Sequence, residues 1–170
     1  MAQLFSLDSV ALVQSDASII QTVQKAFASR RRPPHFGNYK HCEECAEYDE
    51  ILRSRDIDSL RIEDVGTAGS DPICYVTPEG FAYYLPGLVR LALAEPVERY
   101  GWYGSELVSH LCSDGRRNER VLACSVEQRR AIVAFLRHLV ETRSRLADSY
   151  HCSDELFHAI DYWSDESDAV

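Results

Sequence analysis

One short segment of the 170-residue sequence concentrates the side chains that bind transition metals. A Cys-x2-Cys pair, Cys42 and Cys45, occurs together with two histidines, His35 and His41. Zinc in proteins is held by four thiolate or imidazole ligands at the corners of a tetrahedron. On a helix, residues three or four positions apart share a face, so this segment can supply two or three ligands. We therefore predict a zinc site built from His35, His41, Cys42 and Cys45.

The same segment has two other interpretations. Structural zinc sites commonly pair one Cys-x2-Cys with a second, and this sequence has no second pair, so Cys74 or His35 would have to complete the ligand set. Cys45 also continues an apolar helical stripe, which is typical of a buried core thiol. A thiol at a helix N-terminus has a lowered pKa, so Cys42 and Cys45 are also a candidate redox pair, although the neighbouring glutamates oppose that lowering. The sequence leaves these three interpretations open.

Other signatures of catalysis are missing from the sequence. The pair Glu155 and His158 has the spacing of one half of a carboxylate di-iron site, but no second Glu-x-x-His occurs. The sequence also contains no Gly-x-Ser-x-Gly elbow, no glycine-rich phosphate loop and no His-Glu-x-x-His. The sequence therefore favours a binding protein over an enzyme.

The elements that must position these residues are predicted to be helices. Apolar residues recur at helical spacing in six stretches, several with capping residues at their starts. The expected helices span residues 16–32, 41–55, 77–95, 97–111, 125–140 and 153–163. The only strand-like run is short and covers residues 73–76. We predict an all-α or nearly all-α fold: one domain over residues 1–170, about six helices and one short extended segment, with loosely ordered ends at 1–15 and 164–170.

Charge and composition exclude several classes of partner. The formal net charge is −9, from 18 basic and 27 acidic residues, which argues against nucleic acid and against anionic membrane surfaces. The longest apolar region is interrupted by Pro86 and Gly87, and the first residues lack the basic start and apolar run of a signal peptide. We therefore expect a cytoplasmic protein whose six cysteines are free thiols.

The acidic residues are concentrated in two stretches. Residues 43–71 contain ten acids and three arginines, and residues 154–168 contain six acids with no lysine or arginine. Complementary charge speeds and orients the encounter of two proteins. We predict a small binding protein, of the immunity or inhibitor type, that neutralises a cationic protein partner. The expected contact residues are Glu43, Glu47, Glu50, Asp154, Glu155 and Asp161.

Three segments together resemble a known family. They are Thr-Pro-Glu-Gly-Phe-Ala-Tyr-Tyr-Leu-Pro at residues 77–86, His-Cys-Glu-Glu-Cys at residues 41–45, and the Ser125-x-x-Gln128 helix start. In these segments the sequence resembles a family of small bacterial proteins of unknown function. The resemblance implies no activity, cofactor or site residue. Small bacterial proteins of this kind often act as accessory or immunity proteins, which agrees with the predicted cationic partner.

Overall fold

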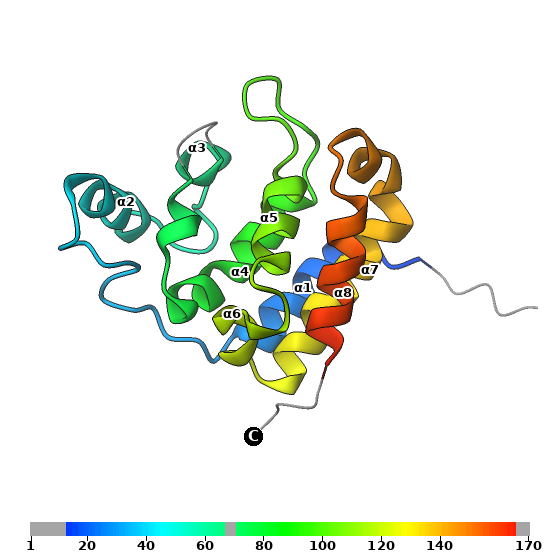
Figure 1. The fold of residues 1–170 in the computed structure, drawn as a ribbon, viewed down its shortest axis with the longest axis horizontal. Helices are drawn as coiled ribbons and strands as arrows, with labels where there is room; N and C mark the ends of the chain where they lie inside the picture. The colour runs from blue at the N-terminus through cyan, green and yellow to red at the C-terminus, as the bar shows by residue number, and fades with distance from the viewer. Residues whose placement is uncertain (1–12, 67–70, 166–170) are drawn as a thin grey trace, which may run out of the picture.

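The computed structural model describes residues 13–66 and 71–165, and within these ranges the chain forms eight α-helices, two 3-10 helices and no β-sheet (Figure 1). The α-helices of ten residues or more are α1 (Asp16–Phe27), α2 (Glu43–Arg53), α4 (Pro78–Ala92), α5 (Tyr103–Cys112), α7 (Val126–Ser149) and α8 (Ser153–Ser164). The shorter elements are α3 (Ile62–Val65), η1 (Pro72–Tyr75), η2 (Gly115–Arg117) and α6 (Glu119–Leu122). The predicted all-α fold is confirmed. The expectation of loosely ordered ends falls largely on residues 1–12 and 166–170, which lie outside the described part of the chain.

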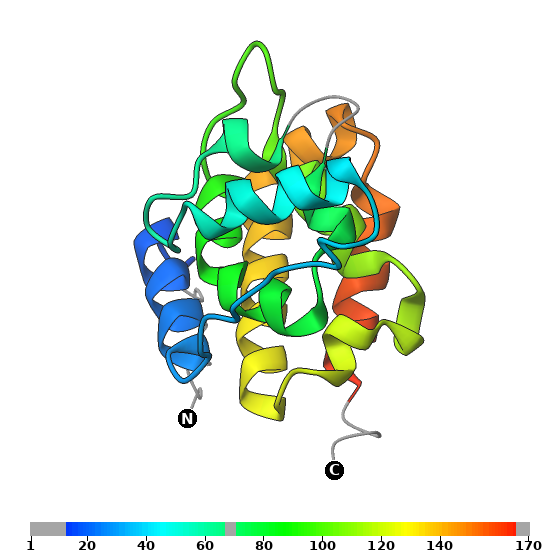
Figure 2. The same cartoon turned by 90° about the vertical axis from the view of Figure 1, so that its left-hand side faces the viewer.

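Helix α4 lies at the centre of the packing. It begins where the hydroxyl of Thr77 accepts a hydrogen bond from the amide of Gly80 and where Pro78 takes the first helical position, as predicted for a capped helix start. Ten of its fifteen residues are buried. Helices α1 and α5 pack on α4, while α7 packs against α1, α5 and α8 (Figure 2). None of the helices in the described ranges is both long enough and apolar enough to cross a membrane.

The N-terminal helix is tied to the longest helix by a polar contact. The carboxylate of Asp16, at the start of α1, accepts hydrogen bonds from both terminal nitrogens of Arg143, at 2.7 and 2.5 Å. It also lies 2.7 Å from Nε2 of His138. Arg143 leaves the helical conformation inside α7, with φ −127° and ψ 20°. The arginine head also reaches the carbonyl of Leu93, so one side chain joins α1, α7 and the end of α4.

Helix α2 lies at one edge of the molecule, away from α7 and α8 (Figure 1). Its C-terminal end is held by Tyr84 of α4, whose hydroxyl lies 2.5 Å from the carbonyl of Leu52 and 3.0 Å from that of Arg55. Its middle is held by Tyr48, whose ring stacks on that of Tyr75 in η1 at 5.6 Å between centroids. These contacts leave the N-terminal end of α2 to be positioned by the loop before it.

The short extended segment predicted over residues 73–76 is wrong, because most of it is the 3-10 turn η1. The carboxylate of Asp71 accepts the amide of Ile73 at 2.9 Å, and a proline occupies the first position, so the chain starts a helical turn. Only Val76 is extended, and it forms an isolated antiparallel bridge with Gly37. A short apolar run does not by itself distinguish a strand from a buried turn.

Candidate functional site

The loop between α1 and α2 is held by one buried carboxylate. This loop crosses the face of the molecule shown in Figure 2. Asp49, which is 3% exposed, accepts the amides of Phe36 at 2.6 Å and Gly37 at 3.4 Å, and its second oxygen lies 2.6 Å from Nδ1 of His35. Burial by itself raises the pKa of Asp49, but the hydrogen bonds from His35 and the Phe36 amide outweigh it and lower the pKa. A Cβ atom on Gly37 would lie 2.8 Å from the carbonyl oxygen of Tyr75, so glycine allows the loop to approach η1.

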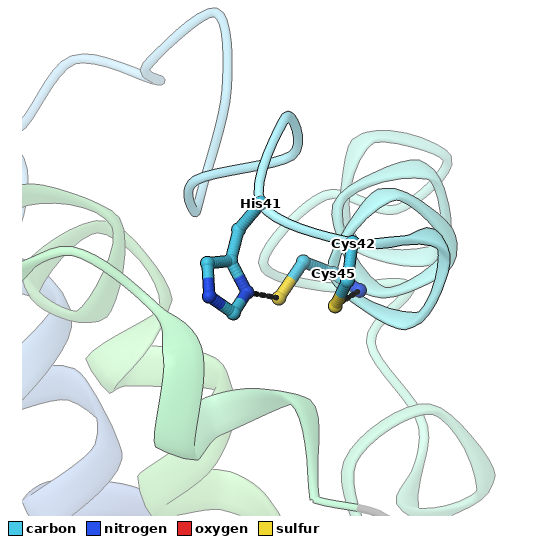
Figure 3. A group of neighbouring side chains, drawn as sticks. All are labelled: His41, Cys42 and Cys45. Atoms are coloured by element: carbon cyan, nitrogen blue, oxygen red, sulfur yellow. Dashed lines mark hydrogen bonds between the residues drawn. The ribbon is translucent and has the colours of Figure 1, made fainter.

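At the end of this loop, His41, Cys42 and Cys45 converge (Figure 3). We call these three residues the α2 cluster. One ligand atom from each side chain lies within 4.8 Å of the other two. The Nδ1 atom of His41 is 3.7 Å from the sulfur of Cys45, and the sulfur of Cys42 accepts the backbone amide of Cys45 at 3.4 Å. His41 and Cys42 are exposed and Cys45 is buried, so the cluster opens to solvent on one side.

The two thiols of the α2 cluster have opposite electrostatic environments. Cys42 is the N-cap of α2, and hydrogen bonds from the amide and thiol of Cys45, with a further one from His41, lower the pKa of its thiol. The thiol of Cys45 donates a hydrogen bond to Cys42, and this bond together with burial raises the pKa of the Cys45 thiol. Cys42 is therefore the thiol that ionises first, and Cys45 is its hydrogen-bond donor.

This arrangement fits two kinds of chemistry. In a tetrahedral zinc site, a thiolate sulfur and an imidazole nitrogen are about 3.5 Å apart, given typical bond lengths of roughly 2.3 and 2.0 Å. The 3.7 Å between His41 and Cys45 matches that separation. Three protein ligands would leave the fourth position open. The same two thiols are also placed to join in a disulfide, as in other Cys-x2-Cys pairs at helix starts.

The structure brings three of the four predicted zinc ligands together. The fourth, His35, is paired with Asp49 and stacked on Tyr39 at 3.8 Å between ring centroids. Cys74, the other residue considered for completing the ligand set, belongs to a different group of side chains with Asp71 and His110.

The comparisons with known proteins agree with the resemblance seen in the sequence. A family model described as a family of unknown function (DUF6714) matches residues 15–167. The chain belongs to DUF6714. No curated protein and no solved structure matches it. The DUF6714 region includes the α2 cluster and every residue predicted to contact a partner.

The acidic residues of this DUF6714 protein do not form one surface. Glu43, Glu47 and Glu50 are exposed on α2, whereas Asp154, Glu155 and Asp161 are exposed on α8, on the other side of the molecule (Figure 1). One of the second group, Asp161, is paired with Arg116 at 2.7 Å. On α2, Glu47 and Glu50 line a shallow hollow of about 430 Å³ with the side chain of Ile51, which is 37% exposed. The two groups are therefore separate candidate contact surfaces.

Sequence reasoning missed the second group of potential ligand residues, Asp71, Cys74 and His110. His110 lies 39 positions after Asp71 and is brought to it by the packing of α5. The only local signal is the Asp-x2-Cys spacing of Asp71 and Cys74.

Proposed function

We propose that this DUF6714 protein binds a transition metal, zinc by preference, through His41, Cys42 and Cys45. The observation that carries the proposal is the convergence of two thiols and one imidazole, each with a ligand atom within 4.8 Å of the other two. The sulfur and nitrogen ligands suit zinc better than calcium or magnesium, which take oxygen ligands. The hydrogen bonds that lower the pKa of Cys42 also favour the thiolate that a metal needs.

The position of the cluster supports a binding role rather than catalysis at this site. His41 and Cys42 are exposed, and the hollow that Cys45 lines with Tyr48 and Asp49 is small, about 10 Å³. A fourth ligand would come from water or from another protein. Metal bound here would join the end of the loop to the start of α2, which would stabilise the edge of the fold.

Metal analysis tests this proposal. Protein purified without added metal is assayed for zinc by elemental analysis, as wild type, as the double variant Cys42→Ser/Cys45→Ser, and as Cys112→Ser, a control outside both ligand groups. The double variant should lose one equivalent of zinc relative to wild type, and Cys112→Ser should lose none. Equal zinc content in the double variant and wild type would overturn the proposal, as would a wild type with well under one equivalent.

A second candidate function is thiol–disulfide exchange by the same pair. The asymmetry between an exposed thiol of lowered pKa and a buried thiol of raised pKa favours it. The Cys42 thiolate would attack a disulfide of a partner molecule and release one thiolate. Cys45 would then lose its proton and attack the sulfur of Cys42, forming the Cys42–Cys45 disulfide and releasing the second thiol. The pair loses two electrons and two protons, and the partner disulfide gains them.

Mass spectrometry after alkylation separates the two candidates. Metal-free protein is equilibrated with reduced and oxidised glutathione at fixed ratios, quenched and alkylated. Redox function predicts a Cys42–Cys45 disulfide that forms and is reduced again reversibly across the physiological range of glutathione ratios. Thiols that stay fully reduced at every ratio would overturn it and leave metal binding as the only function of the cluster.

We also propose that the acidic face of α2 binds a cationic protein, as an immunity or inhibitor protein would, in the cytoplasm. What supports this is the exposure of Glu43, Glu47 and Glu50 beside the apolar side chain of Ile51, which gives both charge and contact area. Affinity capture from the native host, repeated at rising salt, tests it. Reversal of two charges, Glu47→Lys/Glu50→Lys, should abolish capture of a specific partner, and salt-insensitive capture would argue against the proposal.

A further inference from the structure

A second group of potential ligands lies where η1 meets α5. We call Asp71, Cys74 and His110 the α5 cluster, because His110 of α5 brings it together. One carboxylate oxygen of Asp71 lies 2.6 Å from Nε2 of His110 and 3.7 Å from the sulfur of Cys74. The other oxygen caps η1 through the amide of Ile73. The carboxylate is therefore fixed in place, with Oδ1 on the turn and Oδ2 directed at the thiol and the imidazole.

The separations are close to those of ligands on one metal ion. A carboxylate oxygen and a thiolate on tetrahedral zinc are about 3.6 Å apart, and an oxygen and an imidazole nitrogen about 3.3 Å apart. The observed Asp71–Cys74 distance of 3.7 Å already fits. The Asp71–His110 distance of 2.6 Å is that of a hydrogen bond, so these two groups would separate by less than 1 Å to admit the ion.

Two further observations point to a bound group at the α5 cluster. The first is a cleft of about 670 Å³ that Cys74 and His110 line together with Arg117 and Arg120. The second is the hydroxyl of Tyr103, which is fully buried and has no hydrogen-bond partner in the described part of the chain. Tyr103 precedes His110 by seven positions and so lies on the same face of α5.

The charges of the α5 cluster reach that buried phenol. Burial raises the pKa of Tyr103 well above its usual value, and the carboxylates of Asp71 and Glu106 add to the rise. The unpartnered hydroxyl is therefore close enough to Asp71 to be affected by its charge, although Tyr103 is not one of the residues that line the cleft. Buried hydroxyls in native proteins are nearly always hydrogen-bonded, so an unpartnered one beside the α5 cluster is unusual.

The geometry points to a second zinc site in this protein, formed by Asp71, Cys74 and His110, with its open coordination position facing the cleft. This inference goes beyond the function proposed for the α2 cluster, because it uses different residues in a different place. The ligand types again suit zinc, and three protein ligands with one open position are typical of zinc sites that bind a further molecule.

The alternative that Cys74 acts as a nucleophile with His110 as its base fits the geometry less well. The Nε2 atom of His110 is paired with the Asp71 carboxylate and not with the thiol. Cys74 is exposed, but desolvation by its surroundings and the same carboxylate raise the pKa of its thiol, which disfavours a free thiolate. A metal ion reverses this, because a coordinated thiol loses its proton.

The arginines of the cleft indicate what the open position would take. The carboxylate and thiolate together balance the two charges of zinc. Asp114 and Glu119 line the cleft together with Arg117 and Arg120, so an anion would be attracted by the guanidinium group next to it and not by the cleft as a whole. Arg120 is held in place by the carbonyl of Ile73, at 2.6 Å, and by the ring of Phe81, whose centroid is 4.3 Å from the guanidinium carbon. An anionic oxygen ligand, carboxylate or phosphate, could contact both the metal and these arginines.

Metal titration with variants of each cluster tests the inference. Metal-free protein is titrated with zinc against a competing chelator, and circular dichroism checks that each variant is folded. Wild type should bind two equivalents, Cys42→Ser/Cys45→Ser one, Cys74→Ser one and the triple variant none. Asp71→Asn, which keeps the cap on η1, should weaken the second site at least tenfold. Cys112→Ser, two residues from His110, is the matched control and should bind two.

The absorption spectrum of bound cobalt reports directly on whether Cys74 is a metal ligand, which a measurement of stability would not. In Cys42→Ser/Cys45→Ser, cobalt at the α5 cluster should give the thiolate-to-cobalt absorption band, and Cys74→Ser added to that background should remove it. Inorganic phosphate should shift the cobalt bands if it enters the open position. An unchanged spectrum would overturn the assignment of that position.

The outcomes separate the two sites. If Cys42→Ser/Cys45→Ser binds no zinc, or its cobalt complex lacks the thiolate band, the second site is overturned and the first is untouched. If wild type binds a single zinc that Cys74→Ser loses and Cys42→Ser/Cys45→Ser keeps, the function proposed for the α2 cluster fails and the second site stands.

Discussion

The α2 and α5 clusters place similar side chains in opposite settings. The α2 cluster comes from five consecutive residues at an exposed helix start, whereas the α5 cluster joins residues 39 positions apart beside a cleft. Their cysteines respond accordingly. Both Cys42 and Cys74 are exposed, but the pKa of Cys42 is lowered by the amide and thiol of Cys45, and that of Cys74 is raised by desolvation and by Asp71. The partner group, more than the residue type, decides what a thiol can do.

The largest expected contrast is in thiol reactivity. Cys42 should react with iodoacetamide faster than any other cysteine in metal-free protein at pH 7, and several-fold faster than Cys74. Burial raises the pKa of Cys124 to about 11. Relative to a thiol of pKa 9, Cys124 should therefore carry on the order of 100-fold less thiolate. Timed alkylation read by peptide mass spectrometry gives the order. If Cys74 reacts first, the electrostatic contrast between the clusters is wrong.

The next contrast concerns what holds each cluster. Asp49→Ala removes the carboxylate that accepts the Phe36 and Gly37 amides and pairs with His35, and we expect a loss of about 3 kcal/mol in the free energy of unfolding. Urea denaturation measures it. Asp58→Ala, in which an exposed carboxylate is removed, should change stability by less than about 0.5 kcal/mol. A loss below about 1 kcal/mol for Asp49→Ala would show that the loop is held by other contacts.

A smaller effect separates the two histidines in metal-free protein. His110→Ala removes a buried ring and its hydrogen bond to Asp71, so we expect a loss of about 2 kcal/mol. His41→Ala removes an exposed ring and should cost less than about 0.5 kcal/mol. Chemical denaturation in the presence of a chelator measures both. Equal losses would mean that the α2 cluster is as much a part of the packing as the α5 cluster.

The smallest expected effect is a dependence of stability on acid pH. The pKa of Asp49 is lower in the folded protein than its usual 3.8, so its ionised form stabilises the fold. That contribution is complete above the unfolded value and is lost as pH falls through the folded one. Wild type should therefore lose more stability than Asp49→Asn between neutral pH and about pH 3. Parallel stability profiles for the two proteins would contradict the lowered pKa.

The sequence predicted those parts of the fold that depend on interactions between residues close together in the chain. The helix at Thr77-Pro78 and the capping box of Ser125 and Gln128 depend on neighbours three residues away, and both were predicted correctly. The turn at Asp71 was missed because the apolar run that follows it has no periodicity that separates a strand from a turn.

The candidate sites divide in the same way. The sequence grouped His41, Cys42 and Cys45 correctly, but by helical spacing, whereas His41 and Cys42 precede α2 and converge with Cys45 because Cys42 is the extended N-cap of the helix. The partner of His35 could not be predicted, because Asp49 reaches it only through the fold of the loop. The same is true of His110, whose contact with Asp71 depends on how α5 packs.

The contact between α1 and α7 has a consequence for how the protein is made. Helix α1 leaves the ribosome before α4 and α7, but its apolar stripe of Ile19, Val23 and Phe27 packs on these later helices. At typical rates of translation, roughly 6 to 23 seconds pass between the end of α1 and the arrival of Arg143, which pairs with Asp16. During that interval the nascent chain exposes a hydrophobic surface that chaperones can bind. The contact between α1 and α7 can form only after translation has passed Arg143.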